Sequence, residues 1–568
     1  MPSLLDQQMD AVLAALTAPG GQMPVVTTTR DGRDYPMIAA APPALTYYFA
    51  HFCAEHHNKT FLVAGEERLS FAEVYAIAGQ VARALVDGHG VQRGDRVGIA
   101  MRNSPSWIAL YMGILMAGGV ATLLNGWWQT AELAAAIAEV ECALVFADAP
   151  RAQRLDEATG LSANVVPIDD RLPLAQALAG VIARGGTAET QLPMLTGEDN
   201  ATILFTSGST GQSKGALADH RGLTQAVFNY LAQAVTMLTI ATQMGQPPQG
   251  QPSTLLNVPL FHVTAEVPVF LQSFAMGRKL VLMPKWDAEE AMRLIEREQI
   301  SYFVGVPLMS FEILTHPNRH KYNLTSVTDF AAGGAPRPVE HVKRIHEELP
   351  GAPLLGYGLT ETNGVGCGNF RDNYLAKPNS TGRPSYPLVE LAILDGAGQP
   401  VAQGARGEVA IRSICNFKGY WNRPEATRDA FTADQFFLTG DIGYLDEDGY
   451  LFIVDRKKDI IIRGGENISC QEVEAALYEN PAVAEAAVFG LPDDRYGEVP
   501  GAVVHIRAGE VMDAEALCEF LAGRIAAFKV PARIWLSPAP LPRLGTEKID
   551  KVALRTAYRE RHIAERAA

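Results

Sequence analysis

Residues 202–215 read Thr-Ile-Leu-Phe-Thr-Ser-Gly-Ser-Thr-Gly-Gln-Ser-Lys-Gly. The first four residues are β-branched, aliphatic or aromatic, which is the pattern of a buried strand. The loop that follows holds five hydroxyl side chains, three glycines and Lys214. Glycines let several backbone N–H groups turn toward one anion, hydroxyl groups add donors, and the lysine adds positive charge. The stretch therefore predicts a buried strand ending in a polyphosphate-binding loop, rather than a flexible Ser/Gly-rich linker.

This loop is not the P-loop of nucleotidases, because Gly208, Gly211 and Lys214 do not have the spacing of that motif. It resembles the phosphate loop of the adenylate-forming superfamily, which includes acyl-CoA synthetases, luciferases and the adenylation domains of peptide synthetases. The usual pattern there is Thr-Ser-Gly-Ser/Thr-Thr-Gly-x-Pro-Lys-Gly, and this chain has Ser213 in the place of the proline. The resemblance assigns these residues to ATP binding: Thr206, Ser207, Gly208, Ser209, Thr210, Gly211 and Lys214.

Size and composition limit the classes of function. A chain of 568 residues is too long for one hydrophobic core, so two or more domains are expected. The net charge of −15 argues against nucleic acid as a partner. The six cysteines are scattered without a C-x-x-C pair, which suggests neither a zinc site nor a disulfide framework. Because the N-terminus also lacks a basic region typical of signal peptides, we expect a cytoplasmic protein.

One uncharged segment has two interpretations. No residue from Ser104 to Thr130 is charged, and the segment is long enough to span a bilayer. Alternatively, a helix over 107–117 and a buried strand over 120–124 would be separated by a turn at Gly118-Gly119. The second interpretation fits a parallel α/β core, whose strands are apolar on both faces. We therefore expect no transmembrane segment.

The rest of the chain alternates between strand and helix patterns. Ser70 with Glu73 three residues later predicts a helix start, and Arg96–Ala100 and Lys279–Met283 read as strands. This alternation predicts an α/β fold with mostly parallel sheets. From about Leu391, antiparallel strands and then a compact α+β pattern ending near Arg555 follow.

The resemblance completes this fold prediction. It implies a large N-terminal domain of α/β subdomains with a small β-barrel-like part, followed by a small mobile α+β domain. We place the N-terminal adenylate-forming domain at 1–455, the hinge at 456–459 and the C-terminal domain at 460–568.

Further motifs follow in the order that the superfamily has them. Pro259-Leu260-Phe261-His262 resembles the element that lines the acyl pocket, which would place His262 near the substrate carboxylate. Ala265 stands where fatty-acid ligases often have glycine. Glu266 adjoins the presumed pocket wall, and either faces away from it or restricts which acids fit.

Two motifs would form the nucleotide site. The small-residue turn at 331–336 would let adenine approach the backbone closely, with Gly334, Ala335 and Pro336 in contact. Residues 356–362 read Gly-Tyr-Gly-Leu-Thr-Glu-Thr and match the Tyr-Gly-x-Thr-Glu element. An aromatic face can stack on adenine, a hydroxyl can bond a phosphate, and a carboxylate can hold Mg²⁺. By the resemblance these roles fall to the following residues: Tyr357 with Gly358, Thr360, and Glu361.

The C-terminal motifs carry the ribose site, the hinge and the second substrate. Phe437–Asp441 resembles the element whose aspartate accepts hydrogen bonds from the ribose hydroxyls, so Asp441 is the candidate. Arg456 would contact ribose or phosphate, and Lys458 falls at the hinge position. The Arg-Gly-Gly-Glu-Asn-Ile turn resembles the element that forms part of the CoA tunnel. Its candidate residues are Gly464, Gly465 and Glu466.

Residues 541–551 resemble the element that carries the catalytic lysine. Lys548 is the candidate because Ile549-Asp550-Lys551 keeps the register, although Glu547 replaces the usual glycine. With Lys548, the catalytic candidates are His262, Thr360 and Glu361.

The set of motifs looks most like a bacterial fatty acyl-CoA ligase. That family uses ATP, Mg²⁺ and CoA to convert a carboxylic acid into an acyl-adenylate and then a thioester. A medium- or long-chain fatty acid is the expected substrate. The alternatives are an aryl acid ligase of the cinnamate or benzoate type, an enzyme that loads a carrier protein, and a non-catalytic adenylate-binding homologue. A homodimer is compatible with the resemblance.

Overall fold

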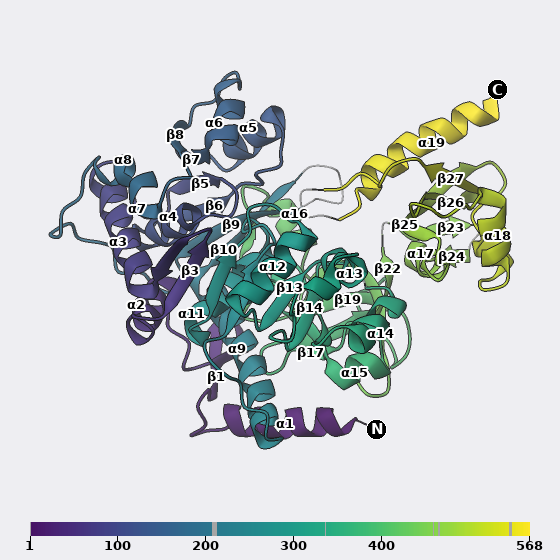
Figure 1. Cartoon of the computed structure of the whole chain (residues 1–568), viewed down its shortest axis with the longest axis horizontal. Coiled ribbons are helices and arrows are strands. Elements are labelled where there is room, and N and C mark those ends of the chain that lie inside the picture. The colour runs from purple at the N-terminus through teal and green to yellow at the C-terminus, as the bar shows by residue number, and fades with distance from the viewer. Residues whose placement is uncertain are drawn as a thin grey trace.

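A computed structural model of the protein describes residues 2–206, 213–335, 337–457, 459–463, 466–544 and 548–567. The chain forms a large body built on two extended sheets and a small C-terminal unit beside it (Figure 1). The small unit has its own sheet and its own buried clusters, around Val473 and around Phe489. The predicted α/β class with a small α+β C-terminal domain is confirmed.

The first sheet of the body contains the strand that opens the phosphate-loop motif. Strands β9, β6, β5, β7 and β8 are parallel, and β10 and β20 are added antiparallel at one edge. In spatial order the strands are β20 (Gly419–Tyr420), β10 (Lys214–Asp219), β9 (Asn200–Thr206), β6 (Val120–Leu123), β5 (Arg96–Ala100), β7 (Leu144–Asp148) and β8 (Asn164–Ile168).

The second sheet has nine strands, and its central six are parallel. In spatial order they are β17 (Arg383–Pro384), β16 (Gly366–Phe370), β15 (Ala352–Gly358), β14 (Asp329–Gly333), β13 (Tyr302–Gly305), β11 (Ser253–Leu256), β12 (Lys279–Leu282), β3 (Thr60–Ala64) and β4 (Glu67–Ser70). Parallel strands end at one edge of a sheet, so the turns after β11, β13, β14 and β15 are brought together. Three of the predicted motifs lie on these turns.

Helices flank both sheets, as a parallel sheet requires. Those of the body are α2 (Leu45–Glu55), α3 (Phe71–Asp87), α4 (Pro105–Met116), α5 (Thr130–Glu139), α6 (Ala149–Asp156), α7 (Leu174–Ala177), α8 (Ala179–Ile182), α9 (His220–Gln243), α10 (Val263–Ala265), α11 (Gln272–Met276), α12 (Ala288–Glu298), α13 (Pro307–Thr315), α14 (Val339–Glu348), α15 (Arg371–Ala376) and α16 (Pro424–Asp429). Shorter helical turns are the π-helix η1 (Glu266–Leu271) and the 3₁₀ turns η2 (Arg319–Lys321) and η3 (Thr360–Thr362).

The uncharged segment from Ser104 to Thr130 forms α4, a turn and β6, as the second interpretation predicted. Every residue of α4 is buried, so this helix is apolar on all sides because it lies in the core. The helix predicted to start at Ser70 is α3, and Ser70 and Glu73 form the expected capping box. In the described part of the chain, no helix combines the length and apolar character needed to cross a membrane.

Two smaller sheets complete the fold. Strands β18 (Glu390–Leu394), β19 (Gly407–Arg412), β21 (Phe437–Leu445) and β22 (Leu451–Arg456) form a four-stranded antiparallel sheet at the end of the body. The C-terminal sheet contains β23 (Ile461–Arg463), β24 (Glu466–Ile468), β25 (Val483–Asp493), β26 (Gly497–Ile506) and β27 (Arg533–Ser537). Helices α17 (Cys470–Tyr478), α18 (Ala514–Ala522) and α19 (Lys551–Ala567) and the 3₁₀ turn η4 (Ala527–Lys529) accompany it. Because α19 continues to Ala567, the prediction that the pattern ends near Arg555 was too short.

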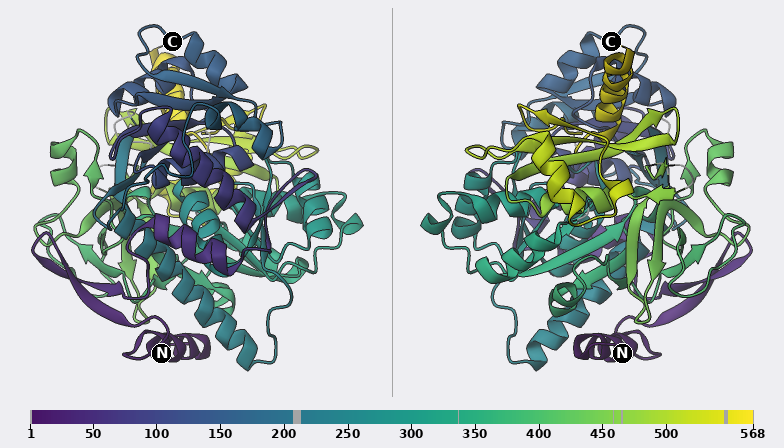
Figure 2. Two further views of the ribbon diagram at one scale, coloured as in Figure 1. Left: turned by 90° about the vertical axis from the view of Figure 1, so that its left-hand side faces the viewer. Right: turned by 90° about the vertical axis from the view of Figure 1, so that its right-hand side faces the viewer.

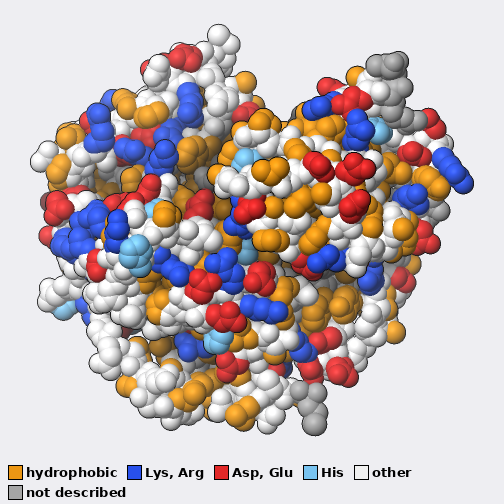
Figure 3. Space-filling view, turned by 45° about the vertical axis from the view of Figure 1, so that its right-hand side comes forward, with side chains coloured by type: hydrophobic (Ala, Val, Ile, Leu, Met, Phe, Trp, Pro, Cys, Tyr) orange, Lys and Arg blue, Asp and Glu red, His pale blue; other side chains and the backbone are white. Residues whose placement is uncertain are grey.

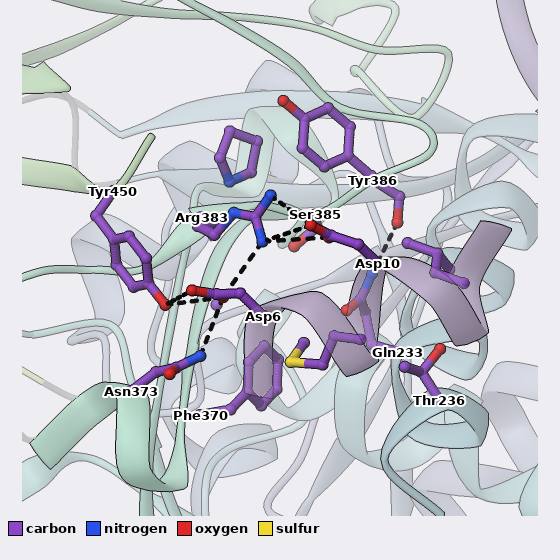
Figure 4. Close-up of a pocket in the computed structure, with 14 residues that line it drawn as sticks. Asp6, Asp10, Gln233, Thr236, Phe370, Asn373, Arg383, Ser385, Tyr386 and Tyr450 are labelled. Carbon is purple, nitrogen blue, oxygen red and sulfur yellow. Dashed lines mark hydrogen bonds and ion pairs between the residues drawn. The ribbon is translucent and has the colours of Figure 1, made fainter. Parts of the chain in front are cut away.

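The N-terminal helix α1 (Leu4–Thr17) packs across α9 at the lower end of the molecule (Figure 2). It is anchored by Asp6, whose carboxylate accepts hydrogen bonds from Tyr450 Oη at 3.0 Å and Asn373 Nδ2 at 3.0 Å and pairs with Arg383 at 3.2 Å (Figure 4). The cavity beside them has a volume of only about 30 Å³, the size of a water molecule. These contacts fasten α1 to the body. The hairpin β1 (Val25–Arg30) and β2 (Arg33–Ile38) follows it.

On the face that Figure 3 shows, acidic and basic side chains are interspersed rather than gathered by sign. Such a surface offers no cationic stripe on this face for a phosphodiester backbone, in agreement with the net charge of −15. None of the six cysteines forms a disulfide.

Candidate active site

Lys548 of the C-terminal domain lies directly over the turn that follows β14. Gly334 in this turn has φ +78°, and a Cβ atom added there would lie 3.2 Å from Lys548 Cε and 3.4 Å from Lys548 Nζ. A positive φ and this close approach both favour glycine. The motif at 331–336 and the motif at 541–551, two hundred residues apart in sequence, therefore meet at one place.

The environment of Lys548 makes its ammonium group easier to deprotonate. Burial lowers the pKa of Lys548 to about 8, and the nearby Arg456 guanidinium adds to the lowering, while the Asp441 carboxylate opposes it. A lysine in such surroundings is a candidate functional group, because shifts of this kind concentrate at active sites.

Asp441 lies on β21, in the four-stranded antiparallel sheet at the end of the large body. It pairs in register with Arg456 on the adjacent strand, and its Oδ1 lies 2.7 Å from Arg456 Nε. Its Oδ2 accepts a hydrogen bond of 2.6 Å from Tyr357 Oη. Burial raises the pKa of the Asp441 carboxyl, and Arg456 and Tyr357 counteract this rise. Three residues predicted from three separate motifs thus form one hydrogen-bonded group.

A second group joins Glu361 on η3 to Tyr420 and Lys214, which lie on the edge strands β20 and β10 of the first sheet. Glu361 Oε1 accepts a hydrogen bond of 2.8 Å from Tyr420 Oη, and Lys214 Nζ lies 4.8 Å from the centre of the Tyr420 ring. Burial raises the pKa of the Glu361 carboxyl, whereas the Tyr420 hydroxyl and the positive charges of Arg456 and Lys214 oppose the rise. Glu361 and Lys214 are therefore neighbours, as a shared role at a polyphosphate requires.

Gly358 fixes the loop that carries Thr360 and Glu361. A Cβ atom at position 358 would lie only 1.9 Å from the carbonyl oxygen of Gly364, so the two backbone segments can approach only with glycine here. The Tyr230 hydroxyl donates a hydrogen bond of 2.5 Å to the same carbonyl.

His262 caps α10 and is held as a neutral imidazole. Its Nδ1 accepts a hydrogen bond of 3.3 Å from the backbone N–H of Thr264, which leaves the ring proton on Nε2. Burial lowers the pKa of His262 to about 3, and the Lys548 ammonium adds to the lowering. At neutral pH this side chain can donate a hydrogen bond from Nε2 but carries no charge.

Glu266 begins the π-helix η1, four residues after His262. It is completely buried, and its Oε1 accepts a hydrogen bond of 2.8 Å from Tyr111 Oη on α4. Burial raises the pKa of Glu266 to about 8, so the carboxyl is mostly protonated at neutral pH.

The remaining predicted residues fall into three groups. Thr206 ends β9 opposite Lys214, Thr360 starts η3, and Ala335 follows Gly334. Glu466 is exposed on β24 and no described contact joins it to the site. Outside the described residues lie Ser207, Gly208, Ser209, Thr210, Gly211, Pro336, Lys458, Gly464, Gly465 and Glu547.

Tyr420 is the site residue that the sequence did not reveal. It reaches Glu361 because the two-residue strand β20 pairs with β10, and these strands lie about two hundred residues apart in the chain. The sequence around it offers one weak signal, an aromatic pair after glycine at 419–421, with no spacing typical of a known site.

Known protein families and solved structures are similar to this chain along most of its length. The model of the "AMP-binding enzyme" family matches residues 49–421, and that of the "AMP-binding enzyme C-terminal domain" matches residues 472–548. A long-chain-fatty-acid–CoA ligase of Bacillus subtilis is 32% identical over 539 residues, covering 90% of this chain and 93% of the relative. The long-chain-fatty-acid–CoA ligase FadD13 of Mycobacterium tuberculosis is 33% identical over 491 residues, covering 86% of this chain and 93% of the relative.

Among solved structures, ATP-bound MatB from Rhodopseudomonas palustris superposes with a TM-score of 0.78 at 29% identity, covering 90% of this chain and 99% of that one. The similarity extends through both the body and the C-terminal domain. The chain belongs to the AMP-binding, adenylate-forming enzyme family.

Proposed function

We propose that this protein is an ATP-dependent acid–CoA ligase whose substrate is a medium- or long-chain fatty acid. In the first step the carboxylate of the acid attacks the α-phosphate of ATP, pyrophosphate leaves, and an acyl-adenylate forms. In the second step the thiol of CoA attacks the acyl carbon, and AMP leaves. The relatives named above support both the reaction and the class of acid.

One observation carries this proposal: Lys548 of the small domain meets Gly334, Asp441 and His262 of the large body at a single site. Two anions must approach each other in the first step, so the site has to supply positive charge where negative charge develops. Lys548 and Arg456 would supply it beside the α-phosphate and ribose, and Lys214 beside the leaving pyrophosphate.

The other described side chains would position the two substrates. Asp441, fixed by Tyr357 and Arg456, would accept hydrogen bonds from the ribose hydroxyls. The small-residue turn at Gly334 would lie against adenine together with the Tyr357 ring. The neutral His262 would donate a hydrogen bond from its Nε2–H group to the substrate carboxylate, without forming an ion pair with it.

Mg²⁺ fits Glu361, because a carboxylate next to a phosphate site is the donor type that this ion takes. When bound, Mg²⁺ neutralises charge on the phosphate oxygens. Burial raises the pKa of Glu361, and binding of the cation would oppose this rise by favouring the ionised carboxylate. The Tyr420 hydroxyl would keep its hydrogen bond to Oε1 of the same carboxylate. Thr360 and the loop hydroxyls would complete the phosphate site.

For the second step, the C-terminal domain would rotate about Lys458, and the turn at 464–466 would form part of the CoA tunnel. We also propose that the protein works in the cytoplasm, and a homodimer is compatible with the fold.

The test is pyrophosphate release with ATP and Mg²⁺ over a panel of fatty, aryl and amino acids, with and without CoA. We expect release with fatty acids and formation of the acyl-CoA thioester when CoA is present. If pyrophosphate release and thioester formation occurred only with aryl acids, the substrate class would be aryl acids instead of fatty acids. Release without thioester would indicate a carrier protein as the acceptor, and absence of release with every acid would contradict the catalytic proposal.

A further inference from the structure

One contact between the two domains lies outside both the active site and the hinge. Arg507, the residue that follows β26 of the C-terminal domain, places its guanidinium carbon 5.2 Å from the ring centre of Phe311 on α13 of the body. A guanidinium at this distance from an aromatic ring is attracted by the ring's negative face. The contact joins the small domain to a helix that begins just after Gly305, at the edge of the sheet where the site lies.

The ring of Phe311 is held in place from the body side. The imidazole of His341 on α14 stacks on it, with ring centres 3.8 Å apart and an angle of 13° between the planes. Burial lowers the pKa of His341 to about 3, and Arg337, Arg507 and Arg344 add to the lowering. A neutral imidazole stacks beside Arg507 without charge repulsion.

The Arg507 charge has no ion-pair partner among the described residues. The Glu510 carboxylate attracts it without reaching ion-pair distance, Arg344 repels it, and its Nε has no hydrogen-bond partner. Arg344 on α14 pairs with Glu348 at 2.7 Å, and its guanidinium carbon lies 5.9 Å from the centre of the same Phe311 ring, so the body already holds this ring between charged and stacked neighbours. Phe311 is therefore the group to which the Arg507 side chain is directed across the domain boundary.

We propose that Arg507 is a positioning residue that holds the C-terminal domain in the arrangement where Lys548 faces the nucleotide site. The contact joins the two domains, so a rotation about the hinge segment that withdraws Lys548 must also separate Arg507 from Phe311. The latch formed by Arg507, Phe311 and His341 thus supports adenylate formation and opposes the rearrangement for the thioester step. This inference rests on the proposed function.

The test compares Arg507→Gln with Arg524→Gln. Arg524 is a matched control because its guanidinium also lies over an aromatic ring, 3.6 Å from the centre of Phe520, but within the C-terminal domain. We expect Arg507→Gln to slow acyl-adenylate formation about threefold to tenfold, which is the range of one partly buried cation–π contact. Conversion of added acyl-adenylate to thioester should stay equal or become faster. Arg507→Lys should recover part of the lost rate, and Arg524→Gln should leave both steps unchanged.

Two results would overturn the latch. One is an adenylation rate for Arg507→Gln equal to that of Arg524→Gln. The other is an equal loss in both half-reactions, which would indicate general damage to the fold.

A distance measurement keeps the latch testable apart from activity. Spectroscopic labels at the exposed positions Met194 and Val511 report the distance between the body and the C-terminal domain. Arg507→Gln should broaden the distribution of this distance relative to the unmutated pair and to Arg524→Gln, and an unchanged distribution would contradict the latch. If the wild-type protein released no pyrophosphate with any acid, the proposed function would fail, while this measurement would still decide on the latch.

Discussion

At the scale of single residues, Lys548 gives the site a pH dependence of defined sign. Its pKa of about 8 means that the ammonium form, which stabilises the transition state, is lost as the pH rises through that value. We expect kcat/KM for ATP in the first half-reaction to fall above about pH 8, because this parameter reports the free enzyme. The measurement is pyrophosphate release between pH 6.5 and 9.5.

Substitutions separate Lys548 from other groups that titrate in this range. Lys548→Ala should lower adenylation by about 10²–10³ and remove the inflection near pH 8. Lys548→Arg keeps the charge at all these pH values, so its residual activity should show no such inflection. Lys285→Ala, at an exposed position, should behave like the wild type. A profile with the same inflection in Lys548→Arg would assign the titration to another group.

Asp441 leads to a prediction about ATP affinity. Asp441→Asn removes a charged acceptor, and hydrogen bonds to charged groups contribute about 1.5–3 kcal/mol each. We expect KM for ATP to rise about 10- to 100-fold while KM for the acid changes little. Tyr357→Phe removes only the 2.6 Å bond that orients the carboxylate and should have a smaller effect. Asp429→Asn, whose side chain is 76% exposed, is the control. Equal rises in both KM values would contradict a specific role at ATP.

At the scale of elements, the hydrogen bond between Glu266 and Tyr111 joins the start of the π-helix η1 to α4. The free energy needed to bury the Glu266 carboxyl in this place increases with pH. Because its pKa is raised from 4.5 to about 8 in the fold, the folded state binds the proton more tightly than the unfolded chain. The contribution of Glu266 to stability is therefore greatest below pH 4.5 and is lost as the pH rises toward 8. At about 1.36 kcal/mol per unit, the loss amounts to about 4–5 kcal/mol at most.

Glu266→Gln should remove this pH dependence. The glutamine side chain cannot ionise. In urea titrations, the free energy of unfolding of the variant should therefore increase relative to that of the wild type between pH 6 and 9. The matched control is Glu298→Gln. Although burial raises the pKa of Glu298, the bonds from Arg68 and Lys279 hold it at about 2. Its contribution is constant above pH 4.5, so this substitution should destabilise the protein equally at pH 6 and 9. A constant difference for Glu266→Gln would mean that its carboxyl is ionised throughout.

Glu266 and Glu361 show which features could not be predicted from the sequence. Strand and helix patterns located β5, β9, α3 and α4 within one or two residues, because periodicity and caps are local properties. The contact between Glu266 and Tyr111, and the contact between Glu361 and Tyr420, depend on packing between segments far apart in the chain. Motif order predicted that Lys548 and Gly334 belong to one site, and the structure supplied the contact between them.

At the scale of the whole molecule, the two domains are also linked just before the proposed hinge. The Asp455 carboxylate accepts hydrogen bonds from the backbone N–H groups of Cys470 and Gln471 at the start of α17. Ser469 Oγ donates to the carbonyl of Val454 at 2.6 Å. If rotation occurs about Lys458, these bonds join parts that move apart. The arrangement in the structure is then one of two states, stabilised by several small contacts that a rotation must break.

Lys458→Pro tests this rotation directly. Proline fixes φ near −65° and removes the backbone N–H, so the residue loses the freedom that a hinge needs. We expect the thioester step to slow at least about tenfold more than adenylation, since a restriction costing about 1.4 kcal/mol already gives that factor. Rapid-quench measurements on each half-reaction, with Lys458→Ala as the control that keeps backbone freedom, separate the two steps. Equal slowing of both by proline would place the moving point elsewhere, because a true hinge should limit only the step that needs the second arrangement.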